Sequence, residues 1–235
     1  MASRENAKEQ RRREIVRAAR VLMQKTGKTG FSMRALAEKA GVSIATPYNL
    51  FGSKQTVMFA VLDADLHQYQ TRLERLRADE IEVFFKAVTL TSSLYASEPL
   101  FYRAVLFAAY NAGGTKFRSI FDGPRHAMWK RLVTDAKQAG VIRDEVEPAA
   151  FAINLGHIFF SCILEWVNNV ISLEEMEARV QYGFAISLHG VCKPDSAERL
   201  WDKVLRTQKR LKALHRKRLK EKTAAEQASS SNGSA

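Results

Sequence analysis

Residues able to perform catalysis or to bind a metal are few and scattered in this sequence. The five histidines, which are His67, His126, His157, His189 and His215, show no paired metal-ligand spacing. The motifs G-x-S-x-G, H-E-x-x-H, the P-loop and G-x-G-x-x-G are all absent. We therefore expect no catalytic site, no metal and no cofactor, and we interpret the protein as a non-enzyme.

Positive charge is concentrated at the two ends of the chain. Residues 1–55 contain 12 Lys and Arg against 4 Asp and Glu, and residues 195–235 contain 11 against 5. Residues 56–194 are close to neutral, with 14 against 16. A basic end favours a polyanionic partner such as DNA, although a charged run alone is also typical of a solvated surface.

The cysteines and the apolar runs are those of a soluble, cytoplasmic protein. Cys162 and Cys192 lie on apolar helical stretches, where two reduced core residues are more typical than a disulfide. The longest apolar run, residues 149–164, is interrupted by polar residues and falls short of the roughly 18 apolar residues of a membrane span. Residues 1–13 contain no apolar core that would indicate a signal peptide.

A short amphipathic helix is predicted just after residue 32. Leu36, Ala37 and Ala40 form one apolar stripe, and Ser32 is placed to accept a hydrogen bond from a free amide of the first turn. Gly41 then suits a turn, because glycine reaches positive φ without steric cost. This helix therefore ends in a tight glycine turn.

A second short helix follows directly. Ser43 is placed to cap it, and the helix is predicted over residues 44–51. Two short helices joined by a glycine turn predict a helix-turn-helix, whose second helix can enter the DNA major groove. Because this motif lies inside the basic residues 1–55, the charge there is better explained by phosphate neutralisation than by solvation.

These residues resemble the DNA-binding domain of TetR-family transcriptional repressors. The resemblance rests on Ala-x-x-x-Gly-Val-Ser at residues 37–43, followed by Thr46, Tyr48, Phe51, Ser53 and Lys54. Pro47, Asn49 and Leu50 depart from the family pattern. Counted from Ser43, Pro47 is the fourth helical residue, so we expect its missing amide to distort the first turn.

The resemblance implies a set of DNA contacts. We expect Ser32, Arg34, Thr46, Tyr48 and Lys54 to contact phosphates, and Ile44, Ala45 and Asn49 to face the bases. The basic arm at residues 11–13 would also lie toward phosphates, or would only solubilise the chain.

The remainder of the chain is predicted to be helical, which gives an all-α fold. Only 5 Pro and 12 Gly occur in 235 residues. We expect a helix-turn-helix DNA-binding domain over residues 1–55 and a helical-bundle ligand-binding and dimerisation domain over residues 56–194. A basic C-terminal helix and a disordered tail should occupy residues 195–235.

Large apolar side chains are concentrated in the middle helices, and most of them should form a core. The family resemblance favours a ligand cavity among these helices, and their sparse charge favours a hydrophobic small molecule. The candidate lining residues are Phe101, Phe107, Tyr110, Trp129, Phe159 and Trp166. Glu165 is a pocket carboxylate, a residue at the helix surface or the partner of an Arg, and His157 is expected to be a core histidine.

Residues 195–222 are expected to form a very basic helix. Leu200, Val204, Thr207, Leu211 and Leu214 alternate by four and three along it. The helix is either solvated and loosely packed, or it is a second phosphate contact or a partner-binding extension. The family resemblance does not extend to it.

Three interpretations of function compete. The first is a ligand-responsive repressor that binds a palindromic operator as a homodimer, with subunits joined through residues 149–170 and 172–192. The second is a constitutive DNA-architectural protein without a ligand, and the third is a helical enzyme. The motif, the placement of charge and the length of the chain together favour the first.

Overall fold

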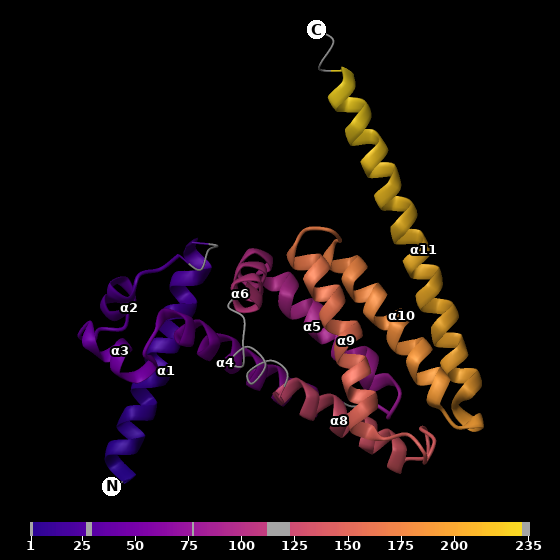
Figure 1. Ribbon diagram of the computed structural model, residues 1–235, viewed down its shortest axis with the longest axis horizontal. Coiled ribbons are helices and arrows are strands. Elements are labelled where there is room, and N and C mark those ends of the chain that lie inside the picture. Colours follow the sequence, from indigo (N-terminus) through magenta and orange to yellow (C-terminus); the bar gives the residue numbers. More distant parts are fainter. Residues whose placement is uncertain (1, 27–29, 77, 112–122, 232–235) are drawn as a thin grey trace. The chain divides into compact units, whose positions relative to one another are not determined.

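The computed structural model is built from α-helices, as the sequence predicts (Figure 1). It describes residues 2–26, 30–76, 78–111 and 123–231. Ten helices and no strand lie within these ranges. The chain forms two compact units, one from residues 1–77 and 93–128, the other from residues 78–92 and 129–235.

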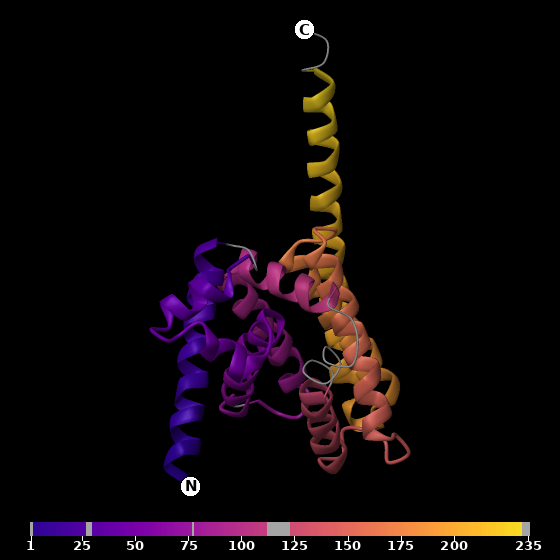
Figure 2. The same ribbon diagram turned by 60° about the vertical axis from the view of Figure 1, so that its left-hand side comes forward.

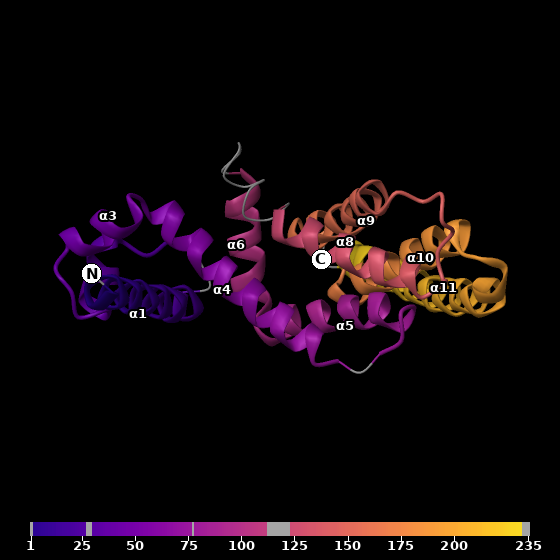
Figure 3. The same cartoon turned by 90° about the horizontal axis from the view of Figure 1, so that it is seen from below.

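The first unit contains the N-terminal helices. These are α1 (Ala2–Thr26), α2 (Met33–Lys39), α3 (Ala45–Phe51), α4 (Lys54–Glu74) and α6 (Pro99–Asn111). Helix α1 packs against α2 and α4, and α3 packs against α2 and α4 (Figure 3). Their shared core is apolar and includes Ile15, Ala19, Met23, Leu36, Ala37, Phe51, Val57 and Val61.

A polar cluster ties α1 to α4 and to the start of α6. The guanidinium of Arg20 donates to both carboxylate oxygens of Asp65 and, at 2.9 Å, to Glu98. The hydroxyl of Tyr102 donates to Asp65 at 2.9 Å, and burial raises the pKa of Tyr102. The Arg20 guanidinium also lies 4.9 Å from the centre of the Phe101 ring. Each charge in the cluster therefore has a partner.

The second unit is built around α9 (Pro148–Val167) and α10 (Leu173–Val191). Parts of α5 (Glu82–Ser97) and α8 (Gly123–Gln138) belong to it, and the rest of both helices belongs to the first unit. Four rings cluster between these helices. Trp129 lies 6.4 Å from Phe84, 5.9 Å from Phe159 and 5.1 Å from Phe184, measured between ring centres.

Helix α9 is the one described helix that is long and apolar enough to cross a membrane. A core helix passes the same test of length and composition, and α9 has the burial pattern of one. Its Phe151, Leu155, Phe159 and Trp166 are buried within the unit.

The sequence Ser172-Leu-Glu-Glu175 at the start of α10 has the pattern of a capping box, and the structure forms one half of it. Ser172 accepts a hydrogen bond from the Glu175 amide at 3.0 Å, and Ile171 and Met176 are both buried. The Glu175 carboxylate does not complete a capping box; instead it forms an ion pair with Arg179 at 2.7 Å. Arg179 also donates to Glu165 at 2.7 Å, so of the alternatives for Glu165 the pairing with an Arg is observed.

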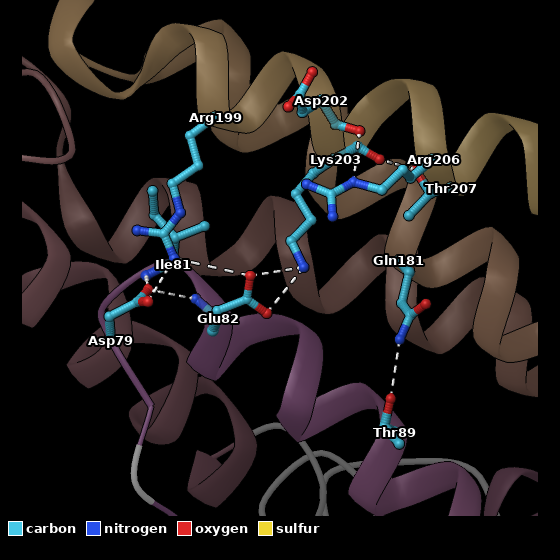
Figure 4. A network of polar contacts seen from close by, with 10 residues as sticks. All are labelled: Asp79, Ile81, Glu82, Thr89, Gln181, Arg199, Asp202, Lys203, Arg206 and Thr207. Carbon is cyan, nitrogen blue, oxygen red and sulfur yellow. Dashed lines mark hydrogen bonds and ion pairs between the residues drawn. The ribbon is translucent and has the colours of Figure 1, made fainter.

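The last helix, α11 (Pro194–Ser231), packs antiparallel along α10. Leu200, Val204 and Thr207 of the predicted stripe are buried, whereas Leu211 and Leu214 are half-buried. The helix is anchored rather than loosely packed, because Arg199 donates to Asp79 at 2.5 Å and Lys203 pairs with Glu82 at 2.7 Å (Figure 4).

Two expectations need correction. Helix α11 continues to Ser231, so the residues after Lys222 that were expected to be disordered are helical as far as the description extends. His157 lies on the exposed side of α9 and is not a core histidine. Residues 195–231 pack with the second unit. The expected boundary between residues 55 and 56 separates DNA binding from ligand binding, and this functional division stays a prediction. By packing, α4 belongs with the helices before it.

The two cysteines are free and buried, as expected. Burial raises the pKa of the Cys162 thiol to about 11. A thiol with a raised pKa is protonated at neutral pH and therefore unreactive.

Candidate nucleic-acid interface

The turn between α2 and α3 has the conformation predicted from its glycine. Ser32 caps α2 by accepting a hydrogen bond from the Ala35 amide at 3.0 Å. At the other end, Gly41 has a φ of 65° and donates to the Glu38 carbonyl, and Val42 donates to the Ala37 carbonyl at 3.0 Å. These two bonds form a Schellman motif, which ends α2 and turns the chain into α3.

The start of α3 differs from the prediction in a way that explains Pro47. The helix begins at Ala45 with Ile44 as its N-cap, and Ser43 does not cap it. Instead, the hydroxyls of Ser43 and Thr46 lie 2.9 Å apart. Pro47 is therefore the third helical residue, and the first turn of a helix leaves its amides free in any case. The ring is buried, and the expected distortion from a lost hydrogen bond does not arise.

Helix α1 fixes the end of α3 through a residue expected to face DNA. Arg12 donates to the Leu50 carbonyl at 2.6 Å, and its guanidinium lies 4.5 Å from the centre of the Phe51 ring. Arg12 thus supports α3 from behind. Arg13 pairs with Glu9 at 3.4 Å on an exposed surface, while Arg11 remains exposed and keeps the predicted role.

Most of the eight predicted DNA contacts lie at the surface. Ile44 and Tyr48 expose 54% and 50% of their surface, although both are large apolar residues. Ser32, Arg34, Ala45 and Asn49 are also exposed, and Thr46 is half-buried. Residues 44, 45, 48 and 49 follow helical spacing, so they share one side of α3.

Lys54 is placed by an aromatic ring. It is half-buried at the first position of α4, and its Nζ lies 5.1 Å from the centre of the Phe31 ring. Ser53 caps the same helix end by accepting a hydrogen bond from the Thr56 amide at 3.2 Å. A lysine held over a ring is more ordered than a free surface lysine, which favours a defined contact.

The predicted ligand-binding residues do not form one group. Trp129 and Phe159 are buried together in the second unit, and Trp166 is fully buried in the same unit. Phe101 is buried in the first unit against Tyr102. Phe107 and Tyr110, on α6, are about half exposed. Among the described residues, no group of three His, Cys, Asp or Glu side chains could hold a metal ion.

Helices α2 and α3, with α1 behind them, define a helix-turn-helix DNA-binding module. Residues 15–61 match the family model described as "Bacterial regulatory proteins, tetR family". Over these residues the chain carries the DNA-binding module of TetR-family transcriptional regulators.

Solved structures of other proteins share the fold at low sequence identity. The TetR-family repressor FadR of Thermus thermophilus, in complex with lauroyl-CoA, is 19% identical with a TM-score of 0.66, over 76% of this chain and 94% of that one. RolR, in complex with resorcinol, is 16% identical with a TM-score of 0.62, over 85% and 95%. TylP, a TetR regulator of Streptomyces fradiae, is 19% identical with a TM-score of 0.59, over 91% and 94%. No curated protein sequence matches the chain.

Two substitutions separate phosphate contacts from base contacts. Lys54→Ala should weaken binding to every DNA sequence and lower the slope of log K against log salt by about 0.9, because one phosphate neutralisation is lost. Asn49→Ala should relax the preference at one base position, at a cost of about 1–3 kcal/mol there. Fluorescence anisotropy across a salt series, with a panel of single-base operator variants, measures both effects.

The two role assignments are wrong if Lys54→Ala alters sequence preference and leaves the salt slope unchanged. Glu38→Ala on the exposed face of α2 is a suitable control for folding, since it removes no cation.

Proposed function

We propose that this protein is a ligand-responsive repressor that binds a palindromic operator as a homodimer and is released by a hydrophobic small molecule. The observation that carries the proposal is the exposed side of α3, where Ile44, Ala45, Tyr48 and Asn49 lie together on a strongly basic module. A helix held by its neighbours with apolar and amide groups exposed is suited to thymine methyl groups and adenine edges in the major groove.

Two-fold pairing would give such a module its specificity. One recognition helix contacts few bases, so two half-sites read together are needed for tight binding. Apolar exposure on α9 and α10 supports a dimer contact there: Ile153 and Ile186 each expose nearly half of their surface. Large exposed apolar residues on neighbouring helices are typical of a subunit interface.

The small residue Gly183 serves packing inside the subunit. A Cβ at this position would lie 2.7 Å from Cγ2 of Ile158, so α9 and α10 approach closely there. A large side chain at residue 183 would disturb the fold of one chain, and Ile186 is the cleaner probe of the contact between chains.

Ile186→Arg should convert the dimer to a monomer of unchanged helicity. In a two-fold contact the new charge lies near its own copy and is buried without a partner, which is strongly unfavourable. Light scattering and circular dichroism test this, and binding to a palindromic site should fall to that of a single half-site. Leu100→Arg, at an exposed apolar position of α6, is the control. An Ile186→Arg protein that stays dimeric and folded rules out this interface.

A hydrophobic effector is favoured by the interior of the second unit. The rings of Phe84, Trp129, Phe159 and Phe184 gather among α5, α8, α9 and α10, and spaces between such helices are common ligand sites. FadR and RolR were solved with lauroyl-CoA and resorcinol, which suggests acyl compounds and small phenols as first probes. Phe101, Phe107, Tyr110 and Trp166 remain predicted lining residues.

The expected mechanism is a shift between two states. In one state the two recognition helices match the operator, and in the other they are misplaced. A ligand that binds the second state more tightly shifts the protein toward it. The size of the shift is limited by the difference between the ligand's affinities for the two states. We place this regulator in the cytoplasm, where its DNA is, and assign it no catalytic role.

Phe159→Trp should abolish the response to ligand while operator binding is retained. The larger ring would fill space beside Trp129 at a cost of about 1–3 kcal/mol, which a folded unit tolerates. Titration of operator complexes with acyl-CoA and phenol panels measures the response, and Leu100→Trp is the exposed control. If the folded Phe159→Trp variant responds to ligand as the parent does, Phe159 does not line the site.

A further inference from the structure

Helix α11 uses one of its faces to pack on α10 and leaves the opposite face strongly basic. Residues 206–222 contain nine Lys and Arg and one Glu, and no Asp or Glu lies between 206 and 220. The first part of α11 lies along α10, and its C-terminal part continues past the end of α10 (Figures 1 and 2). Its role is not explained by operator recognition through α3.

The basic residues of α11 divide into two groups by orientation. Arg210 lies toward α10, where it donates to Gln181 at 3.1 Å and pairs with Glu177 at 3.4 Å. Arg218 lies on the same side and pairs with the buried Glu175 at 3.2 Å. These two arginines anchor the helix, and their charges are compensated within the unit.

The second group forms what we call the basic ridge. At 3.6 residues per turn, positions 209, 216 and 220 fall opposite the row that packs on α10, and the other members flank them. The ridge consists of Arg206, Lys209, Lys212, Arg216, Lys217 and Lys220, all of which are exposed. It spans about 21 Å, from fourteen rises of about 1.5 Å. The anchoring of α11 therefore presents a fixed row of cations to solvent.

We propose that the basic ridge binds the phosphate backbone of duplex DNA without reading its sequence. Duplex DNA carries one negative charge per about 1.7 Å of its axis, so the ridge faces an excess of phosphates along its whole length. Four of its six members are lysines, which act as point charges toward phosphates and lack the planar fork that suits bidentate base contacts. Contacts of this kind position a protein and carry no sequence information.

Other partners fit the ridge less well. Single-stranded nucleic acid is bound through aromatic stacking, and residues 206–222 contain no Phe, Tyr or Trp. An amphipathic helix that enters a membrane surface needs a continuous free apolar face. The row of α11 with Leu200, Val204 and Thr207 is packed on α10, and within residues 206–220 Leu219 is the one large apolar residue that is exposed. Protein interfaces are depleted in Lys and have an apolar centre, whereas the ridge is all cations.

The ridge adds to the proposed function a second contact with duplex DNA. This inference rests on the proposed function only because the ridge and the exposed side of α3 would both bind duplex DNA. The two contacts differ in what they recognise, so a measurement on DNA without an operator isolates the ridge.

The test compares two triple variants of the full chain that lose the same charge. The ridge variant is Lys209→Gln with Arg216→Gln and Lys220→Gln. The control variant is Lys86→Gln with Lys130→Gln and Arg131→Gln, at exposed positions of the same unit. Glutamine keeps helix propensity close to that of lysine and arginine, and circular dichroism should show equal helicity in all three proteins.

Binding to a short non-operator duplex is followed by anisotropy over a salt series. The ridge variant should lower the slope of log K against log salt by about 2.7, since three phosphate neutralisations are lost, and the control should lower it by less than about 1. The difference should persist when Arg34→Ala and Lys54→Ala are added to both variants. Equal slopes for the two variants overturn the proposal.

Two further outcomes keep the proposals apart. If the parent selects no operator but the ridge variant still loses its slope, the ridge is supported and the proposed repressor is not. Binding to vesicles of phosphatidylglycerol is measured in parallel. If the ridge substitutions weaken vesicle binding and leave duplex binding unchanged, the ridge is a membrane surface and the proposal is overturned.

Discussion

The first unit depends on one partly buried guanidinium. Arg20 of α1 bonds Asp65 of α4 and Glu98 at the start of α6, and Tyr102 completes the cluster on Asp65. Removal of one partner from such a pair leaves an uncompensated charge, at a cost of about 3–5 kcal/mol when burial is complete. Since α1 also holds the end of α3 through Arg12, the position of the recognition helix follows from the position of α1.

The chain uses its excess of positive charge in two distinct ways. Arg12, Arg20, Arg210 and Arg218 act inside the fold, where each meets a carbonyl or a carboxylate. Other cations, such as those of the basic ridge, are exposed and available to a polyanion. Net charge alone does not distinguish these groups, because the distinction lies in which face of a helix each residue occupies.

Local features were predictable from the sequence and long-range pairings were not. The Ser32 cap, the Gly41 turn and the Ser172 cap depend on residues within a few positions, so their chemistry is legible in the chain. Arg12 was expected to face DNA because nothing near it in the sequence indicates Leu50, 38 residues away. The half-exposed positions of Phe107 and Tyr110 were missed because composition predicts burial but does not say which face of α6 is covered.

The most direct test of the account is selection of duplex fragments by the purified protein, followed by footprinting of the bound sites. A two-fold pair of modules that each place α3 in the major groove predicts fragments sharing an inverted repeat, with half-sites one helical turn apart, about 34 Å. Protection should fall on two adjacent major grooves of one DNA face. Bound fragments with no common sequence, or with a single unrepeated site, would contradict the account.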